Sequence, residues 1–268
     1  MLYWWQSDNK TEEMPRSRVT KLLVIGNWKM NPIKHDEAKR IVQATKKIAA
    51  KLQRTDVVVC PPYPYIAMAI AKNGVIAAGA QDVFTEPQGS FTGEVSAEML
   101  KDMGASYVIV GHSERRKAGE TNQDVANKAK AALRAGLIPV VCVGEETRDD
   151  HGAYLDTLKA QIRASLEGVQ RKSVKQIVVA YEPVWAIGAK EAMTPQLVQE
   201  MGIFVRKTLA DIFGQSEVMS VPVLYGGSVN FRNARDIIVQ GQVQGLLVGR
   251  ESVNPPGFTE LLKEVDRK

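Results

Sequence analysis

The chain has 268 residues, of which 44% are hydrophobic and 24% are charged. This composition fits one large globular domain or two small ones. The formal net charge is +5, yet no run of five like charges occurs and no basic stretch is interleaved with aromatic residues. We therefore expect no nucleic-acid partner.

The cysteines and histidines give no sign of a disulfide framework or a metal site. Cys60 and Cys142 both lie inside apolar runs, where a thiol usually behaves as a small hydrophobic side chain. The three histidines, His35, His112 and His151, have no ligand spacing among themselves. We expect no metal and no cofactor, a cytoplasmic location, and no membrane partner, because no apolar run is long enough to span a bilayer.

Residues 1–18 differ in composition from the rest of the chain. An aromatic beginning, Leu2-Tyr3-Trp4-Trp5, is followed by mixed charges, and no cationic segment precedes it. The apolar stretch Leu2-Tyr3-Trp4-Trp5 is too short for the core of a signal peptide. We interpret residues 1–18 as a tail and residues 19–268 as one catalytic domain.

Eight apolar runs follow in chain order, with amphipathic stretches between them. Most runs are continuous rather than alternating, which is typical of strands buried on both faces. The expected strands are 22–25, 57–60, 75–80, 107–110, 138–143, 177–180, 221–224 and 245–248. Helical spacing of apolar residues is clear at 37–52, 124–135, 154–166 and 196–213.

Eight strands alternating with helices in about 250 residues predict a single α/β (β/α)8 barrel, a parallel barrel ringed by helices. The alternative is a doubly wound open sheet, which normally carries a glycine fingerprint after its first strand. The sequence at 26–31, Gly-Asn-Trp-Lys-Met-Asn, lacks that fingerprint.

The active site of such a barrel lies at the carboxyl ends of its strands, so the residues that follow each run are the candidate site residues. Asn27 and Lys29 follow the first run, His112 the fourth and Glu182 the sixth. Glycine-containing turns follow the seventh and eighth, at 226–228 and 249–250. A carboxylate can take a proton from carbon, an imidazole and an ammonium can stabilise the enediolate oxygens, and glycine turns can bind phosphate through backbone N–H groups.

Each of these residues also has an ordinary structural explanation. A glutamate at a strand end is more often a salt-bridge partner, and His112 could simply cap a helix. Arg115 and Arg116 are expected to be structural ion-pair partners. The convergence of five strand ends on one rim favours catalysis, and the absence of nucleotide or metal motifs favours a small phosphorylated carbonyl substrate.

Five motifs in chain order resemble one known family. They are NWKMN (27–31), FTGE (91–94), GHSERR (111–116), AYEPVWAIG (180–188) and YGGSV (225–229). Together they resemble triosephosphate isomerase from about residue 21 to the end of the chain. The resemblance implies a barrel isomerase of glycolysis and gluconeogenesis that interconverts dihydroxyacetone phosphate and D-glyceraldehyde 3-phosphate through an enediolate.

The resemblance also implies a role for individual residues. Glu182 corresponds to the base and His112 to the electrophile, acting as neutral imidazole. Lys29 corresponds to the cation near the bridging oxygen and phosphate, with Asn27 beside it. The remaining implied roles are Glu114 as the partner of Lys29, Ser113 as the group that holds Glu182 before substrate arrives, and Gly188, Ser228, Gly249 and Arg250 as phosphate-binding positions. The implied lid consists of Pro183, Val184, Trp185, Ala186, Ile187, Gly188, Ala189, Lys190, Glu191, Ala192 and Met193.

A long connection at 81–94 has no pattern of its own beyond Phe91-Thr92-Gly93-Glu94. Loops of this length are usually functional. In the family it enters the neighbouring subunit, and the counterpart of Thr92 approaches the partner's site, so the resemblance implies a homodimer. The alternative is an ordinary surface loop.

Three segments depart from the family pattern, and the first is the stretch after GHSERR, which is about one residue short before Gly119-Glu120. The lid usually continues after Gly188 as Thr-Gly-Lys-Thr-Ala, but here Lys190 stands where glycine is usual, which predicts a lid that closes less readily. The eighth turn is usually Gly-Gly-Ala-Ser, but here it is Gly249-Arg250-Glu251-Ser252. A carboxylate at Glu251 predicts weaker phosphate binding, unless it points to solvent.

Two other functions compete with this interpretation. One is another phosphate-binding barrel enzyme, such as a pentose-phosphate epimerase, which would usually need metal ligands that this rim lacks. The other is a non-catalytic binding or scaffold role, which a substitution at Lys29, His112 or Glu182 would favour. All three residues are intact.

Overall fold

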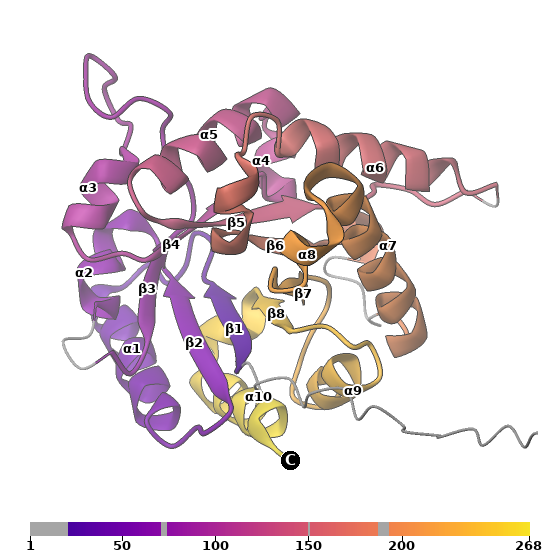
Figure 1. The fold of residues 1–268 in the computed structure, drawn as a ribbon. Helices are drawn as coiled ribbons and strands as arrows, with labels where there is room; N and C mark the ends of the chain where they lie inside the picture. The colour runs from indigo at the N-terminus through magenta and orange to yellow at the C-terminus, as the bar shows by residue number, and fades with distance from the viewer. Residues whose placement is uncertain (1–20, 71–73, 150, 187–192) are drawn as a thin grey trace, which may run out of the picture.

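The computed structural model describes residues 21–70, 74–149, 151–186 and 193–268. The described chain forms a closed barrel of eight parallel strands in sequence order, with helices on its outer surface (Figure 1). The (β/α)8 barrel expected from the sequence is confirmed. The expected tail, residues 1–18, lies outside the described residues.

The eight strands lie close to the eight expected runs. β6 and β7 each extend one residue further than expected, to a tyrosine, and β3 begins two residues later. The strands are β1 Leu22–Asn27, β2 Thr55–Cys60, β3 Ala77–Ala80, β4 Tyr107–Val110, β5 Ile138–Val143, β6 Val178–Tyr181, β7 Val223–Tyr225 and β8 Gly245–Val248.

The barrel closes where β1 pairs with β8, with Leu23 opposite Gly245. A methyl group at residue 245 would lie 1.8 Å from the carbonyl oxygen of Leu23, so this close approach requires glycine. Side chains alternate along each strand. Leu23 and Ile25 pack inside the barrel, whereas Val24 packs in the larger core between strands and helices.

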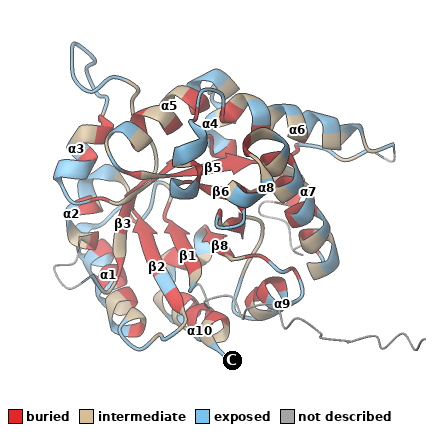
Figure 2. Cartoon of the chain, in the orientation of Figure 1, coloured by how far each residue is buried: buried red, intermediate tan, exposed pale blue. Residues whose placement is uncertain are grey.

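The helices bury one face against the barrel and expose the other (Figure 2). A capping box at Thr121 and Asp124 begins α5, and the Thr194 hydroxyl caps α7. The helices are α1 His35–Ala49, α2 Ile66–Ala69, α3 Ala97–Asp102, α4 Ser113–Lys117, α5 Asn122–Arg134, α6 Ala153–Ser165, α7 Pro195–Phe213, α8 Gln215–Val218, α9 Ala234–Val239 and α10 Pro255–Asp266. Short 3-10 turns are η1 Tyr63–Tyr65, η2 Arg171–Gln176, η3 Val184–Ala186 and η4 Arg250–Val253.

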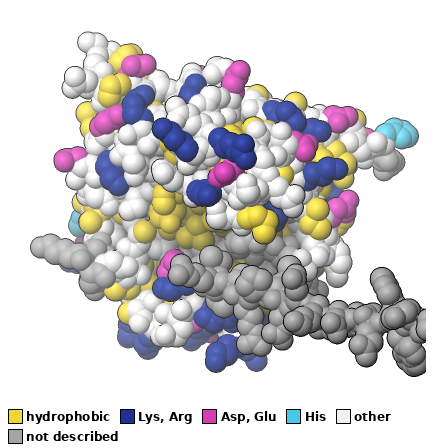
Figure 3. Space-filling model, viewed as in Figure 1, with side chains coloured by type: hydrophobic (Ala, Val, Ile, Leu, Met, Phe, Trp, Pro, Cys, Tyr) yellow, Lys and Arg dark blue, Asp and Glu magenta, His cyan; other side chains and the backbone are white. Residues whose placement is uncertain are grey.

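Charged side chains of both signs are distributed over the face seen in Figure 3, and basic ones gather at its lower end. Two arginines bind the main chain at the end of α10: Arg235 donates to the carbonyls of Arg267 and Lys268, and Arg54 also donates to that of Arg267. No described helix is long and apolar enough to cross a membrane.

Candidate active site

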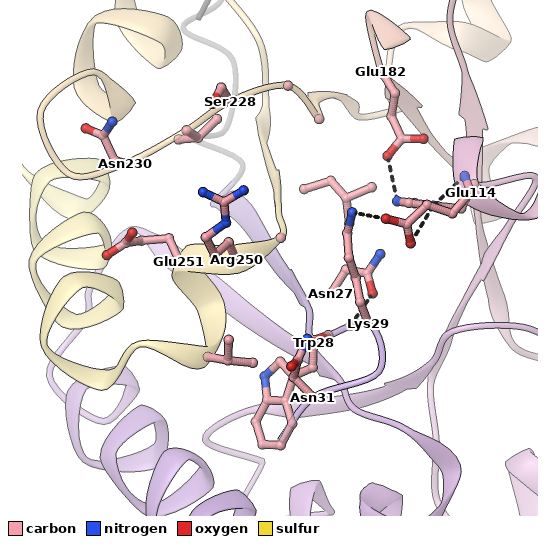
Figure 4. Close-up of a pocket in the computed structure, with 17 residues that line it drawn as sticks. Asn27, Trp28, Lys29, Asn31, Glu114, Glu182, Ser228, Asn230, Arg250 and Glu251 are labelled. Atoms are coloured by element: carbon pink, nitrogen blue, oxygen red, sulfur yellow. Dashed lines mark hydrogen bonds and ion pairs between the residues drawn. The ribbon is translucent and has the colours of Figure 1, made fainter. Parts of the chain in front are cut away.

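A cavity of about 770 Å³ opens at the carboxyl ends of the strands. Its walls come from the segments after β1, β4, β6, β7 and β8, which are the strand ends singled out by the sequence. Its lining residues are Asn27, Trp28, Lys29, Asn31, His112, Glu114, Glu182, Gly226, Gly227, Ser228, Val229, Asn230, Leu247, Gly249, Arg250, Glu251 and Val253 (Figure 4).

Glu182 follows β6 and is buried, with 3% of its surface exposed. Its backbone N–H donates to the carbonyl of Val143 at 2.8 Å, and its Oε2 accepts from the backbone N–H of Ser113 at 3.2 Å. Two glycines make room for it. A methyl group at residue 144 would lie 1.8 Å from the carbonyl oxygen of Glu182, and one at residue 226 would lie 2.8 Å from its Cγ.

His112 directly precedes α4 and is buried beside Glu182. Its Nδ1 accepts from the backbone N–H of Glu114 at 3.2 Å, so Nδ1 carries no proton and the neutral ring has its N–H at Nε2. Nε2 lies 3.2 Å from Oε1 of Glu182. Burial lowers the pKa of His112, but the Glu182 carboxylate raises it by more, so the net shift is upward.

Lys29 is held in place from three sides. Its backbone adopts a positive φ of 55°, and its N–H donates to Oδ1 of Asn27 at 3.0 Å. Gln81 donates to the carbonyl of Lys29 at 2.8 Å. The ammonium forms an ion pair with Glu114, as the family resemblance implies. Glu114 therefore holds the ammonium at the cavity wall.

The opposite end of the cavity is built from the turns after β7 and β8. Ser228, Gly249 and Arg250 all line it. In Figure 4 the guanidinium of Arg250 extends toward Ser228, on the side of the cavity away from Glu182.

Glu251 is directed away from this end of the cavity, toward α10. Its Oε1 accepts from the side-chain amide of Asn254 at 3.0 Å. A methyl group at residue 257 would lie 1.5 Å from Oε1, so the carboxylate packs against the first turn of α10. A negative charge is stabilised there by the helix dipole. This orientation reduces the repulsion that the sequence suggested between Glu251 and a bound phosphate.

Only the ends of the expected lid are described. Pro183, Val184, Trp185 and Ala186 form the first end, which includes η3, and Met193 is at the other. The backbone N–H of Met193 donates to the hydroxyl of Tyr225 at 3.3 Å. The lid residues Ile187, Gly188, Ala189, Lys190, Glu191 and Ala192, and with them the expected effect of Lys190, lie outside the described residues.

A buried carboxylate that was not predicted from the sequence, Glu145, supports the first lid end. Its oxygens accept from the Tyr181 hydroxyl at 2.8 Å, from the Trp185 indole at 2.9 Å and from Nε of Arg148 at 2.9 Å. Arg148 also lies over the Trp185 ring at 5.2 Å. Glu145 comes just after β5, so the strand-end argument that found Glu182 would have found it too.

The two arginines after Glu114 act in different ways. Arg115 forms ion pairs with Asp82 at 2.7 Å and Glu120 at 3.3 Å, as expected of a structural partner. Arg116 instead donates to the carbonyl of Gly111 at 2.7 Å and to that of Cys142 at 3.1 Å. Both arginines fix the segment that carries His112.

Within the described residues, no three His, Cys, Asp or Glu side chains are grouped so that they could hold a metal ion. Thr92 is exposed in the 81–94 connection and is not part of the cavity lining given above. A role for Thr92 in an active site would therefore have to be exerted in another subunit.

Comparisons with known proteins identify the family. A triosephosphate isomerase of Moorella thermoacetica is 40% identical over 244 residues, which are 90% of this chain and 97% of that protein. One of Endomicrobium trichonymphae is 41% identical over 247 residues, which are 91% of this chain and 98% of that protein. A sequence profile of triosephosphate isomerase matches residues 22–265. The chain therefore belongs to the triosephosphate isomerase family.

Proposed function

We propose that this protein catalyses the isomerisation of dihydroxyacetone phosphate and D-glyceraldehyde 3-phosphate, as an enzyme of glycolysis and gluconeogenesis. The observation that carries the proposal is the arrangement of Glu182, His112 and Lys29 on one wall of a cavity whose opposite wall is made of glycine-containing turns. Family membership supports the same reaction.

The proposed chemistry begins with an exchange of hydrogen bonds. In the structure, the Nε2–H of His112 faces Oε1 of Glu182. A substrate carbonyl oxygen that takes over this N–H releases the carboxylate, which can then remove a proton from the adjacent carbon. The Nε2–H and the Lys29 ammonium stabilise the charge that develops on oxygen. His112 gives its Nε2 proton to that oxygen and takes the hydroxyl proton from the neighbouring oxygen, so that one oxygen becomes a hydroxyl and the other a carbonyl. Glu182 returns the carbon-bound proton to the neighbouring carbon, which completes the isomerisation.

The supporting residues have distinct proposed tasks. Ser113 holds Glu182 through its backbone N–H before substrate binds. Glu114 positions the Lys29 ammonium and donates its own N–H to His112. Asn27 fixes the main chain of Lys29. The phosphate is bound by backbone groups around Ser228, Gly249 and Arg250, together with Gly188.

A coupled isomerase assay with a chelator present tests the reaction directly. We expect full activity under chelation, and a loss of at least ~10²-fold in turnover for Glu182→Gln, which removes the base and keeps the shape. Glu146→Gln is the matched control, because Glu146 is an exposed carboxylate outside the cavity lining. Activity that disappears with the chelator would instead favour a metal-dependent epimerase, and near-normal turnover in Glu182→Gln would exclude the assignment of the base.

We also propose that the protein is a homodimer. The connection between β3 and α3 projects from the body of the barrel (Figure 1). Met30 and Ile33, in the segment after Lys29, are 91% and 93% exposed. Gln81 donates to the carbonyl of Lys29, so the two segments adjoin. Exposed apolar side chains beside a projecting loop are typical of an interaction surface.

Sedimentation of the purified protein measures the oligomeric state. We expect a dimer at micromolar concentration that dissociates, with loss of activity, when Met30 and Ile33 are both replaced by Asp. Met219→Asp is the control. Met219 is also highly exposed, but it directly follows α8 and is far in sequence from both the 81–94 connection and the segment after Lys29. A fully active monomer would contradict the proposal.

We also propose a cytoplasmic location, because both cysteines are buried free thiols and form no disulfide.

A further inference from the structure

The eighth turn carries a cation that the family pattern does not supply. Arg250 is exposed at the cavity wall and begins η4. Among the described residues, Arg250 makes no hydrogen bond or ion pair through its side chain, whereas Lys29, the other cation lining the cavity, is paired with Glu114. An arginine without a partner beside a polar cavity retains its full capacity to bind an anion.

The obvious internal partner for Arg250 is its neighbour Glu251, but the geometry separates them. The Glu251 carboxylate accepts from Asn254 and packs against Gly257 in the first turn of α10. In Figure 4 the two side chains diverge, with the Arg250 guanidinium extended toward Ser228. Glu251 therefore does not neutralise the charge of Arg250.

We propose that the Arg250 side chain is a direct ligand of the substrate phosphate and sets the affinity of this enzyme for phosphate dianions. This inference rests on the proposed function, and it adds a side-chain contact to a site otherwise formed by backbone groups. A guanidinium presents parallel N–H donors that match two phosphate oxygens, and such charge-assisted pairs are stronger than neutral hydrogen bonds.

The position of the phosphate decides which kinetic constant responds. The phosphate charge does not change during proton transfer between the two carbons, so a contact to it stabilises the ground state and the transition state equally. Loss of such a contact raises KM and leaves kcat nearly unchanged. This outcome separates Arg250 from Lys29, whose removal is expected to lower kcat.

A measurement of equilibrium phosphate binding tests the inference and does not depend on turnover. Inorganic phosphate is titrated into the wild-type protein, Arg250→Gln and Arg232→Gln by calorimetry. Arg232 is the matched control: it is an exposed arginine near the seventh turn that lies over the Phe231 ring and outside the cavity lining. We expect Arg250→Gln to weaken phosphate binding about tenfold and Arg232→Gln to bind as the wild type does.

A second readout distinguishes a charge contact from a structural role. The ratio of the two phosphate dissociation constants should shrink as salt is raised from low to high, because an exposed charge is screened. A weakening of less than about threefold relative to Arg232→Gln, or a ratio that does not change with salt, would overturn the inference. If the wild-type protein binds phosphate but does not isomerise triose phosphates, the proposed function fails while this test of Arg250 remains valid.

Discussion

The two ends of the cavity are built on different principles. At the end that contains Glu182, His112 and Lys29, every one of these charged or polar side chains already has a partner in the protein. At the other end, Arg250 points its guanidinium into the cavity and has no side-chain partner among the described residues. The first end is preorganised for a geometry that tolerates little change. The second contributes affinity, which can change without altering the chemistry.

Removing the charge at the reacting end should have the largest effect on catalysis. Lys29→Gln eliminates the ammonium that stabilises the enediolate oxygen, and we expect kcat/KM to fall by about 10²-fold. Lys21→Gln is the control, because its ion pair with Asp56 is exposed and lies before β1. Steady-state kinetics of both variants give kcat and KM separately. If Lys29→Gln mainly raised KM, the two ends of the cavity would not differ in the way described.

The close packing around Glu182 predicts that a larger residue at position 144 lowers the stability of the fold. In Gly144→Ala the new methyl group would lie 1.8 Å from a backbone oxygen that cannot move freely. We expect the free energy of unfolding, measured in urea, to fall by about 1–3 kcal/mol. Gly202→Ala in α7 is the matched control: its methyl group would meet Val243 at an ordinary 3.8 Å, so that variant should be neutral or slightly more stable.

The ionisation of His112 reports how closely the reacting groups are coupled. Burial lowers its pKa, Glu182 raises it by more, and Lys29 opposes Glu182. Its imidazole pKa, followed by NMR, should therefore fall in Glu182→Gln. Because the folded pKa is raised, pairing with Glu182 stabilises the fold below the ordinary pKa of histidine, and that contribution is lost as the pH rises through the folded value. An unchanged pKa in Glu182→Gln would show that the two side chains are not coupled.

The smallest effect is expected at the phosphate end, from Glu251. Its carboxylate is turned toward α10 and is engaged by Asn254. Glu251→Gln should therefore change the inhibition constant for inorganic phosphate by less than about twofold, since a screened charge at that orientation contributes little. A large gain in phosphate affinity would instead show that Glu251 repels the bound phosphate, as the sequence suggested. Glu251 and Arg250 would then both determine the affinity for phosphate.

The sequence predicted the barrel well because its signals are local. Continuous apolar runs mark strands that are buried on both faces, and all eight are present. The short helices α2, α3, α4 and α9 were not predicted, because four to six residues are too few for a helical period to stand out. The side chains of Ser96 and His112 cap α3 and α4, whereas α2 and α9 begin without a side-chain cap.

Within the site, residue identities were predictable but orientations were not. The strand-end rule identified Asn27, Lys29, His112 and Glu182, and the structure places all four around one cavity. No local pattern shows that Glu251 turns toward a helix that begins several residues later. The role of Glu145 likewise depends on side chains from β6 and η3, which only the closed barrel brings together.

The third strand has a consequence for how the whole molecule loses its structure. β3 is made of small residues only, Ala77–Ala80, and its backbone lies so close to β2 that a methyl group at residue 79 would be 2.5 Å from Sγ of Cys60. The projecting connection proposed to enter a second subunit begins directly after this strand. Association of two subunits that holds this connection in place therefore also stabilises β3. By mass action, the stability of the fold then depends on the protein concentration. The melting temperature should then rise with protein concentration, so that the dilute enzyme is the fragile one.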